Sequence, residues 1–201
     1  MSEVFTTISG ANGAANNIHP LYYDGAMFAN DGEYFTYGGL FLETTGLASP
    51  AANAVQGYEA YWYGAPRSFT PGFVDADLPN GVTRYVTYGA GVSVPSENKG
   101  FYFSGLKSPD SGPIYFGTPN ASETANTTSN TLISVDLSQE RSEVWANQSL
   151  PAAVPGRASA ELAWVPVGKN GVLVAIGGVL DPEYAQESLS LTDAQSAQDV
   201  S

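Results

Sequence analysis

The sequence predicts an all-β fold built from repeated antiparallel units, and three observations lead to this prediction. The first is composition: only 13% of the 201 residues are charged, against about 25% in a typical soluble domain. The chain has instead 22 Gly, 13 Pro, 12 Tyr and 9 Phe, which favours strands and tight turns over helices. The second observation is a segment that occurs three times, and the third is the matching spacing of residues around it.

The repeated segment consists of a turn, an apolar strand and a terminal glycine pair. Its three copies are residues 30–40, 98–106 and 169–179. Asp31-Gly32 and Asn170-Gly171 are dipeptides typical of type I′ hairpin turns, in which both central residues need a positive φ. Each copy is therefore expected to be the second strand of a hairpin. The terminal pairs are Gly38-Gly39, Ser104-Gly105 and Gly177-Gly178.

A first strand is predicted before each turn, over residues 21–29, 84–94 and 159–167, which are rich in Tyr, Val, Ala and Trp. The spacing from Arg84 to Gly105 is 21 residues, and the spacing from Arg157 to Gly178 is also 21. This equality predicts that the two arginines hold equivalent positions. Counting back 21 residues from Gly39 reaches Ile18, so the first copy lacks the arginine.

Two further strands are predicted in each unit. Residues 57–63 and 131–137 are expected to form the third strand. Phe73 and Trp145 are expected in the fourth, because each lies five residues before a Leu-Pro dipeptide. Four antiparallel strands per unit make the blade of a β-propeller.

At this point the residues resemble the kelch repeat, which has an arginine, a hairpin, a glycine pair, a Val-Asp-Leu strand and a later aromatic residue. Residues 141–151 and 155–168, with the strand that follows, look in particular like the kelch proteins of fungal surfaces and secretomes. The resemblance covers about residues 18–180. The residues that carry it are Gly38, Gly39, Arg84, Ser104, Gly105, Trp145, Arg157, Gly177 and Gly178.

The chain departs from the kelch pattern in three respects. The first copy lacks the arginine, and Ser104 replaces a glycine in the second. The units are also long, at 66 residues from Gly39 to Gly105 and 73 from Gly105 to Gly178, against about 50 in a kelch repeat. The additional residues are expected in loops at 40–56 and 107–130.

The expected organisation is the end of a preceding blade or a loop at 1–17, kelch-like units at about 18–83, 84–156 and 157–180, and a polar, disordered tail at 181–201. These units make about two and a half four-stranded blades, whereas propellers close with four to eight. The ring is therefore expected to be incomplete, and the chain to be a fragment of a longer protein or the product of an incomplete gene model.

Charge and residue usage exclude several classes of function. A formal net charge of −13, with seven basic residues spread singly, argues against binding to nucleic acid or to an anionic membrane surface. The absence of Cys removes disulfides and thiolate metal sites. Residues 171–180 are too short to span a bilayer, and residues 1–10 lack the pattern of a signal peptide.

No catalytic residue, cofactor or metal site is predicted. His19 is the only His, and a loop position before Pro20 is its simpler interpretation; there is also no Gly-x-Ser-x-Gly motif. Asp75 and Asp77 are candidates for calcium or glycosidase chemistry, but no complete calcium-loop pattern follows them. The same chemistry is considered for Asp24, Asp31 and Glu33. For all of these acidic residues, the favoured interpretation is an exposed carboxylate in a loop.

The best binding candidates are the aromatic residues Tyr58, Tyr61, Trp62 and Tyr63. Packing in the core or between blades is the favoured interpretation, and stacking on a sugar is the alternative if they face the mouth of the propeller. Three sequons mark possible glycosylation sites at Asn120, Asn126 and Asn147. The first two lie in a polar segment, 108–130, that is predicted to be an exposed loop.

The predicted function is that of a non-catalytic kelch β-propeller scaffold for protein or glycan interaction. The resemblance implies an extracellular or cell-surface location. The alternative is a fragment of a carbohydrate-active or galactose-oxidase-like propeller enzyme whose catalytic residues lie outside this chain.

Overall fold

The computed structural model describes residues 22–41, 52–59, 62–63, 68–69, 72–107, 127–139 and 142–180. In these ranges the regular structure consists of antiparallel strands and one short 3-10 helix, η1 (Pro95–Glu97). The predicted all-β fold is therefore confirmed.

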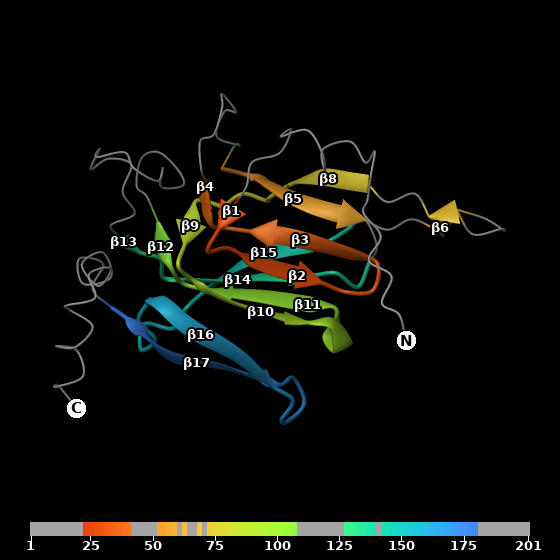
Figure 1. The fold of residues 1–201 in the computed structure, drawn as a ribbon. Helices are drawn as coiled ribbons and strands as arrows, with labels where there is room; N and C mark the ends of the chain where they lie inside the picture. The colour runs from red at the N-terminus through yellow and green to blue at the C-terminus, as the bar shows by residue number, and fades with distance from the viewer. Residues whose placement is uncertain are drawn as a thin grey trace, which may run out of the picture.

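Three units follow one another along the chain (Figure 1). Sheet 1 has the strand order β2 (Ala26–Ala29), β3 (Glu33–Tyr37), β5 (Ala54–Glu59) and β8 (Gly72–Asp77). Sheet 2 has the order β10 (Ala90–Val94), β11 (Lys99–Phe103), β14 (Thr131–Asp136) and β15 (Val144–Ser149). Hairpin 3 pairs β16 (Ala158–Val165) with β17 (Val172–Val179). The short strands are β1 (Tyr22–Tyr23), β4 (Leu40–Phe41), β6 (Trp62–Tyr63), β7 (Ser68–Phe69), β9 (Val86–Thr87), β12 (Leu106–Lys107) and β13 (Thr127–Thr128).

The two sheets share a ladder register in their outer strands. Phe73 lies opposite Tyr58, and Trp145 lies opposite Val135, at the same place in each sheet. The turns that follow are also alike, because Val82 N–H donates to the Pro79 carbonyl (3.0 Å) and Val154 N–H to the Pro151 carbonyl (2.8 Å). The predicted equivalence of Phe73 and Trp145 is therefore confirmed at the level of the backbone.

The terminal pair of each hairpin adopts the left-handed backbone conformation in all three units. The φ values are 70° and 95° at Gly38-Gly39, 56° and 94° at Ser104-Gly105, and 69° and 79° at Gly177-Gly178. On the facing strand, Asp24, Tyr88 and Ser159 also have positive φ, between 54° and 56°. Each hairpin therefore ends where a left-handed pair faces a left-handed residue of the first strand. We call this residue the bulge residue because the ladder opens around it, although the two strands have equal numbers of residues there.

The bulge residue interrupts the predicted first strands. Residues 21–29 were expected to form one strand, but β1 and β2 flank Asp24, and β9 and β10 likewise flank Tyr88. A non-glycine residue at positive φ cannot continue the ladder in register, so the prediction of continuous strands at 21–29 and 84–94 was wrong. In hairpin 3 the bulge lies inside β16, where Ser159 has no partner in the register.

The second residue of each of the first two pairs donates a hydrogen bond to the next unit. Gly39 N–H binds the Val86 carbonyl (2.8 Å), and Gly105 N–H binds the Arg157 carbonyl (3.0 Å). Val86 and Arg157 each lie two residues before the bulge residue of their own unit. The same bond therefore joins sheet 1 to sheet 2 and sheet 2 to hairpin 3.

Ser104 is a strained position that its hydroxyl group stabilises. Its side chain is fully buried, donates to the Ser129 carbonyl (2.6 Å) and accepts from the Arg157 N–H (2.7 Å). Two hydrogen bonds of a buried hydroxyl offset part of the cost of a non-glycine residue at positive φ. Ser104, which takes the place of the first glycine of the pair, therefore adds a hydrogen bond between the second unit and the third.

The predicted type I′ turns are wrong. Asp31 and Gly32 do not have positive φ; the Asn30 side-chain carbonyl instead accepts the N–H groups of Gly32 (2.8 Å) and Glu33 (3.0 Å). Pro95 begins η1 in the second hairpin, and Asn98 ends it at φ 51°. Residues 166–171 form a longer loop in the third. Side-chain capping and proline therefore determine the first two turns.

The equal arginine spacing does not reflect equivalent positions. Arg84 lies four residues before its bulge residue and Arg157 only two, while the loop of hairpin 3 is two residues longer than that of β10–β11. Arg157 is two residues closer to its bulge residue and its loop is two residues longer, so the spacing to the terminal pair is 21 residues in both units. Arg84 is 2% exposed, whereas Arg157 is half-buried and its Nη1 donates to the Gly177 carbonyl (2.7 Å).

The predicted third strands differ in how well they match the structure. Strand β14 covers nearly all of the predicted 131–137. The predicted strand at 57–63 is wrong in extent, because β5 ends at Glu59 and Trp62–Tyr63 pair with β7 instead.

Two apolar layers separate the three units. An aromatic cluster fills the space between sheets 1 and 2, with Tyr37 stacked on Trp145 (5.5 Å between ring centroids) and edge-on to Tyr102 (5.1 Å). The remaining members of this cluster are Phe28 and Phe35. A smaller layer between sheet 2 and hairpin 3 centres on Phe103 and Leu162.

We expect Gly105→Ala to lower the free energy of unfolding by about 3 kcal/mol, because left-handed alanine costs roughly 1 kcal/mol and a clash adds more. A Cβ at Gly105 would lie 2.5 Å from the Thr87 carbonyl oxygen. Gly81→Ala is the matched control: φ is 87° there, but nothing lies within 4 Å of the added Cβ, so about 1 kcal/mol is expected. Urea denaturation measures both, and equal losses would contradict the clash.

Candidate functional site

A cavity of about 300 Å³ lies where the chain passes from sheet 1 to sheet 2. Five separate segments form it: the end of β3, the connection at 81–86, Lys107 in β12, residues 129–133 at the start of β14, and β15. We call it the interunit cavity. Its lining residues are Tyr37, Gly81, Thr83, Tyr85, Val86, Lys107, Ser129, Asn130, Thr131, Ile133 and Asn147.

The inner wall of the interunit cavity is buried and fixed. Val86 and Ile133 are 6% and 2% exposed, and the Tyr37 hydroxyl donates to the Thr83 carbonyl. Burial, and then the neighbouring Tyr102, raise the pKa of Tyr37, while the Arg84 guanidinium opposes this rise. The Tyr37 phenol is therefore a neutral hydrogen-bonded group and not a proton donor near neutral pH.

The rim of the interunit cavity is polar, and it ranges from the buried Ser129 to the exposed Asn130, Lys107 and Asn147. Asn147 Nδ2 donates to the Gly81 carbonyl (2.8 Å), and the Ser129 and Thr131 hydroxyls share a hydrogen bond (2.7 Å). Asn130 and Lys107 are exposed beside them. The Tyr85 ring lies 5.7 Å from the Arg84 guanidinium carbon, which is within the range of a cation–π contact.

The described residues that line this cavity carry hydroxyl, amide and ammonium groups, and none of them carries a carboxyl or imidazole group. Glycoside hydrolysis needs a pair of carboxyl groups, and general acid–base catalysis needs a group that titrates near neutral pH. The arrangement is suited to hydrogen bonding with a polar ligand.

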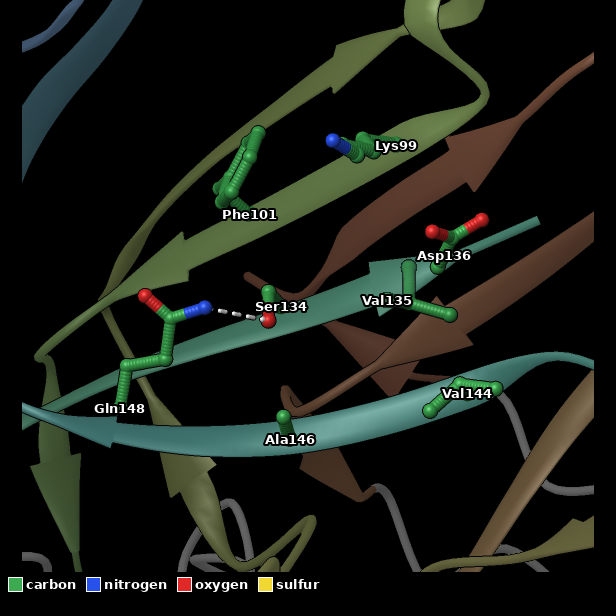
Figure 2. Close-up of a pocket in the computed structure, with 8 residues that line it drawn as sticks. All are labelled: Lys99, Phe101, Ser134, Val135, Asp136, Val144, Ala146 and Gln148. Atoms are coloured by element: carbon green, nitrogen blue, oxygen red, sulfur yellow. Dashed lines mark hydrogen bonds between the residues drawn. The ribbon is translucent and has the colours of Figure 1, made fainter. Parts of the chain in front are cut away.

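A second hollow, of about 240 Å³, lies on the face of sheet 2 beside hairpin 3 (Figure 2). Phe101 and Lys99 come from β11, and Gln148 on β15 donates to the Ser134 hydroxyl on β14 (3.1 Å). Hydrogen bonds from Ser138, and then the charge of Lys99, hold the pKa of Asp136 below its ordinary value. The described lining of this second hollow is partly apolar and partly polar, and Asp136 is its one carboxylate.

The structure describes only some of the predicted site residues. Asn147 is exposed on β15 and borders the interunit cavity. Tyr58, Trp62 and Tyr63 are described as strand residues without their side chains. His19, Tyr61, Asn120 and Asn126 lie outside the described residues.

The acidic candidates do not form a cluster in the described part of the chain. Asp24, Asp31 and Asp77 are exposed, whereas Glu33 is 3% exposed. Within the ranges that the structure covers, no three His, Asp or Glu side chains approach closely enough to hold a metal ion.

Sequence reasoning missed the residues that line the interunit cavity, such as Thr83, Tyr85 and Asn130. One signal was available. Thr83 and Tyr85 follow the Leu78-Pro79 turn after β8, and Asn130 directly precedes β14. The two segments that hold these residues therefore lie at the ends of strands, on the side of the sheets where the left-handed pairs are.

Comparisons with known proteins do not place the chain in a family. No family model matches the sequence, and no curated protein matches it. In the described residues, none of the helical structure is long and apolar enough to cross a membrane.

The buried phenols make stability sensitive to alkali. Burial is the main cause that raises the pKa values of Tyr37 and Tyr102 above their ordinary 10.0. The unfolded chain releases these protons near pH 10 and the folded chain keeps them, so their stabilising contribution is present below pH 10 and is lost above it.

We expect the free energy of unfolding to fall by about 1.4 kcal/mol per pH unit for each buried phenol above pH 10. Tyr102→Phe should reduce this slope, because it removes one titrating group. Urea denaturation at a series of pH values measures the slope. The same free energy at about pH 9 and about pH 11 would overturn this expectation.

Proposed function

We propose that the chain is a non-catalytic scaffold of the kelch β-propeller kind, extracellular or on a cell surface, that binds a glycan or protein partner. The observation that carries the proposal is the recurrence of one backbone arrangement in three units: the left-handed pair, the facing bulge residue and, between successive units, the same hydrogen bond.

The arrangement of the units supports propeller blades. Each sheet is a four-stranded antiparallel meander, and the first strands β2, β10 and β16 lie side by side. Propeller blades are four-stranded sheets arranged around a central channel, which places their first strands next to one another. Successive units therefore pack face to face in chain order, as Figure 1 shows.

The interunit cavity supports a binding role, and its chemistry favours a glycan over a protein segment. Sugar hydroxyls can both donate and accept, and the rim offers the Asn130 amide, the half-buried Thr131 hydroxyl and the Lys107 ammonium. The half-buried Tyr85 ring gives the apolar surface on which a sugar face stacks. The volume of about 300 Å³ lies at the lower limit of ligand pockets and suits one terminal sugar residue.

A glycan array with the purified chain tests the proposal. We expect binding to neutral oligosaccharides and a loss of about tenfold or more in affinity in Asn130→Ala, because losing one hydrogen bond to a buried ligand costs about 1.4 kcal/mol. Lys107→Ala should weaken binding less, since a neutral sugar gives an ammonium group no charge to pair with.

Asn170→Ala and Lys169→Ala are the matched controls. Both residues are exposed in the loop of hairpin 3, far along the chain from the interunit cavity. Unchanged binding in Asn130→Ala, or an equal loss in Asn170→Ala, would remove the interunit cavity as the site.

A further inference from the structure

Asn147 is the one sequon asparagine in the described part of the chain, and it lies on an exposed strand. Asn147, Gln148 and Ser149 are all exposed near the end of β15. β15 is the last strand of sheet 2, and none of the described strands pairs with its outer edge. Attachment of an N-linked glycan requires Asn-x-Ser or Asn-x-Thr at an accessible position, and this segment meets both conditions.

The Asn147 side chain faces the space between sheets 1 and 2. Side chains alternate along a strand, so Asn147 lies on the same face of β15 as Trp145, which packs in the aromatic cluster. Ile133, the partner of Asn147 in the register, is buried in the same core and also lines the interunit cavity. Asn147 therefore points towards the interunit cavity.

The nitrogen atom that would carry the sugar is held at the rim of this cavity. Asn147 Nδ2 donates to the Gly81 carbonyl (2.8 Å), in the connection between sheets 1 and 2. Gly81 is exposed and nothing lies within 4 Å of a Cβ built on it, so there is open space beside this bond. An amide nitrogen has two hydrogens, and attachment of a sugar uses one of them. The second hydrogen can keep the bond to Gly81 and hold the first sugar next to the cavity.

Attachment is a glycosyl transfer in which no group is oxidised or reduced. The donor is an oligosaccharide joined through a diphosphate to a membrane lipid. A bond forms between C1 of the first sugar and Nδ2 of Asn147, while the bond from C1 to the diphosphate oxygen breaks. The bonding electron pair leaves with the lipid diphosphate, and the Nδ2 proton passes to a base of the transferase.

We propose that Asn147 carries an N-linked glycan and that this glycan covers the interunit cavity, where it competes with an external ligand. Thr131 lies opposite Ser149 in the register and Asn130 precedes it, so the ligand-binding rim and the attachment point lie on neighbouring strands. A sugar tethered this closely has a high effective concentration, of about millimolar order, and is expected to exclude a free glycan. The inference rests on the extracellular location and the ligand site of the proposed function.

Mass spectrometry of the full chain secreted from a eukaryotic cell tests the modification. Asn120→Gln and Asn126→Gln are introduced into every chain compared, so that Asn147 holds the one remaining sequon. The glycan is expected on the peptide that contains Asn147. Ser149→Ala should abolish it while keeping the Asn147 amide and its bond to Gly81. Ser149→Thr preserves the sequon and is the matched control that should keep the glycan. An unmodified Asn147 in the secreted chain would overturn the inference.

Acetylation of lysine by acetic anhydride measures the cover without any ligand. Lys107 and Lys169 are both exposed, and of the two Lys107 lines the interunit cavity. If the glycan covers the cavity about nine-tenths of the time, Lys107 should react about tenfold more slowly than in Ser149→Ala. Lys169 should react at the same rate in both chains. Equal rates at Lys107 would show that the glycan leaves the cavity open and would overturn the inference.

Binding of neutral oligosaccharides by Ser149→Ala separates this inference from the proposed function. Binding by this variant, with an apparent Kd raised about tenfold in the glycosylated chain, would support both. Equal binding in the two forms would overturn the inference alone. Protection of Lys107 without binding in either form would overturn only the proposed function, because the glycan would still cover the cavity. Circular dichroism establishes that both Ser149 variants keep their strands.

Discussion

The hydrogen bond from the second residue of each of the first two terminal pairs to the following unit is the constraint on which the rest of the structure depends. Gly39 and Gly105 reach the next unit only because both residues of the pair adopt positive φ, which turns the chain out of its strand. A side chain at Gly105 would meet the backbone of Thr87 and Gly89. Glycine is therefore required there by contact as well as by conformation.

The aromatic cluster follows from this constraint. Once the pair sets the distance between units, Phe28 lies directly on Gly100, and Trp145 reaches the rings of Tyr37 and Phe35. Trp145 Nε1 is buried and has no hydrogen-bond partner among the described residues. Its edge-on contact with Phe35 is of the kind that stabilises aromatic pairs by about 1 kcal/mol beyond their burial.

The sequence was sufficient for the features that depend on local spacing. The glycine pairs, the three hairpins and the common position of Phe73 and Trp145 all depend on short offsets along the chain. The sequence was insufficient in the first turn, where hydrogen bonds to the Asn30 side chain determine the conformation and the Asp-Gly preference for a type I′ turn does not. It was also insufficient for Arg84 and Arg157, whose equal spacing to the terminal pair conceals two different positions in the strand and two different loop lengths. The interunit cavity could not be predicted, because its lining comes from five segments whose proximity depends on the stacking of the sheets.

Hydrogen exchange followed residue by residue tests this account most directly. If the bonds from Gly39 and Gly105 hold successive units together, their amide hydrogens should exchange as slowly as those of the central strands β3 and β11. The control is the Gly81 amide, an exposed turn position that makes no backbone bond of this kind within the part of the chain that the structure describes. Exchange of Gly39 and Gly105 as fast as that of Gly81 would contradict the claim that these bonds join the units.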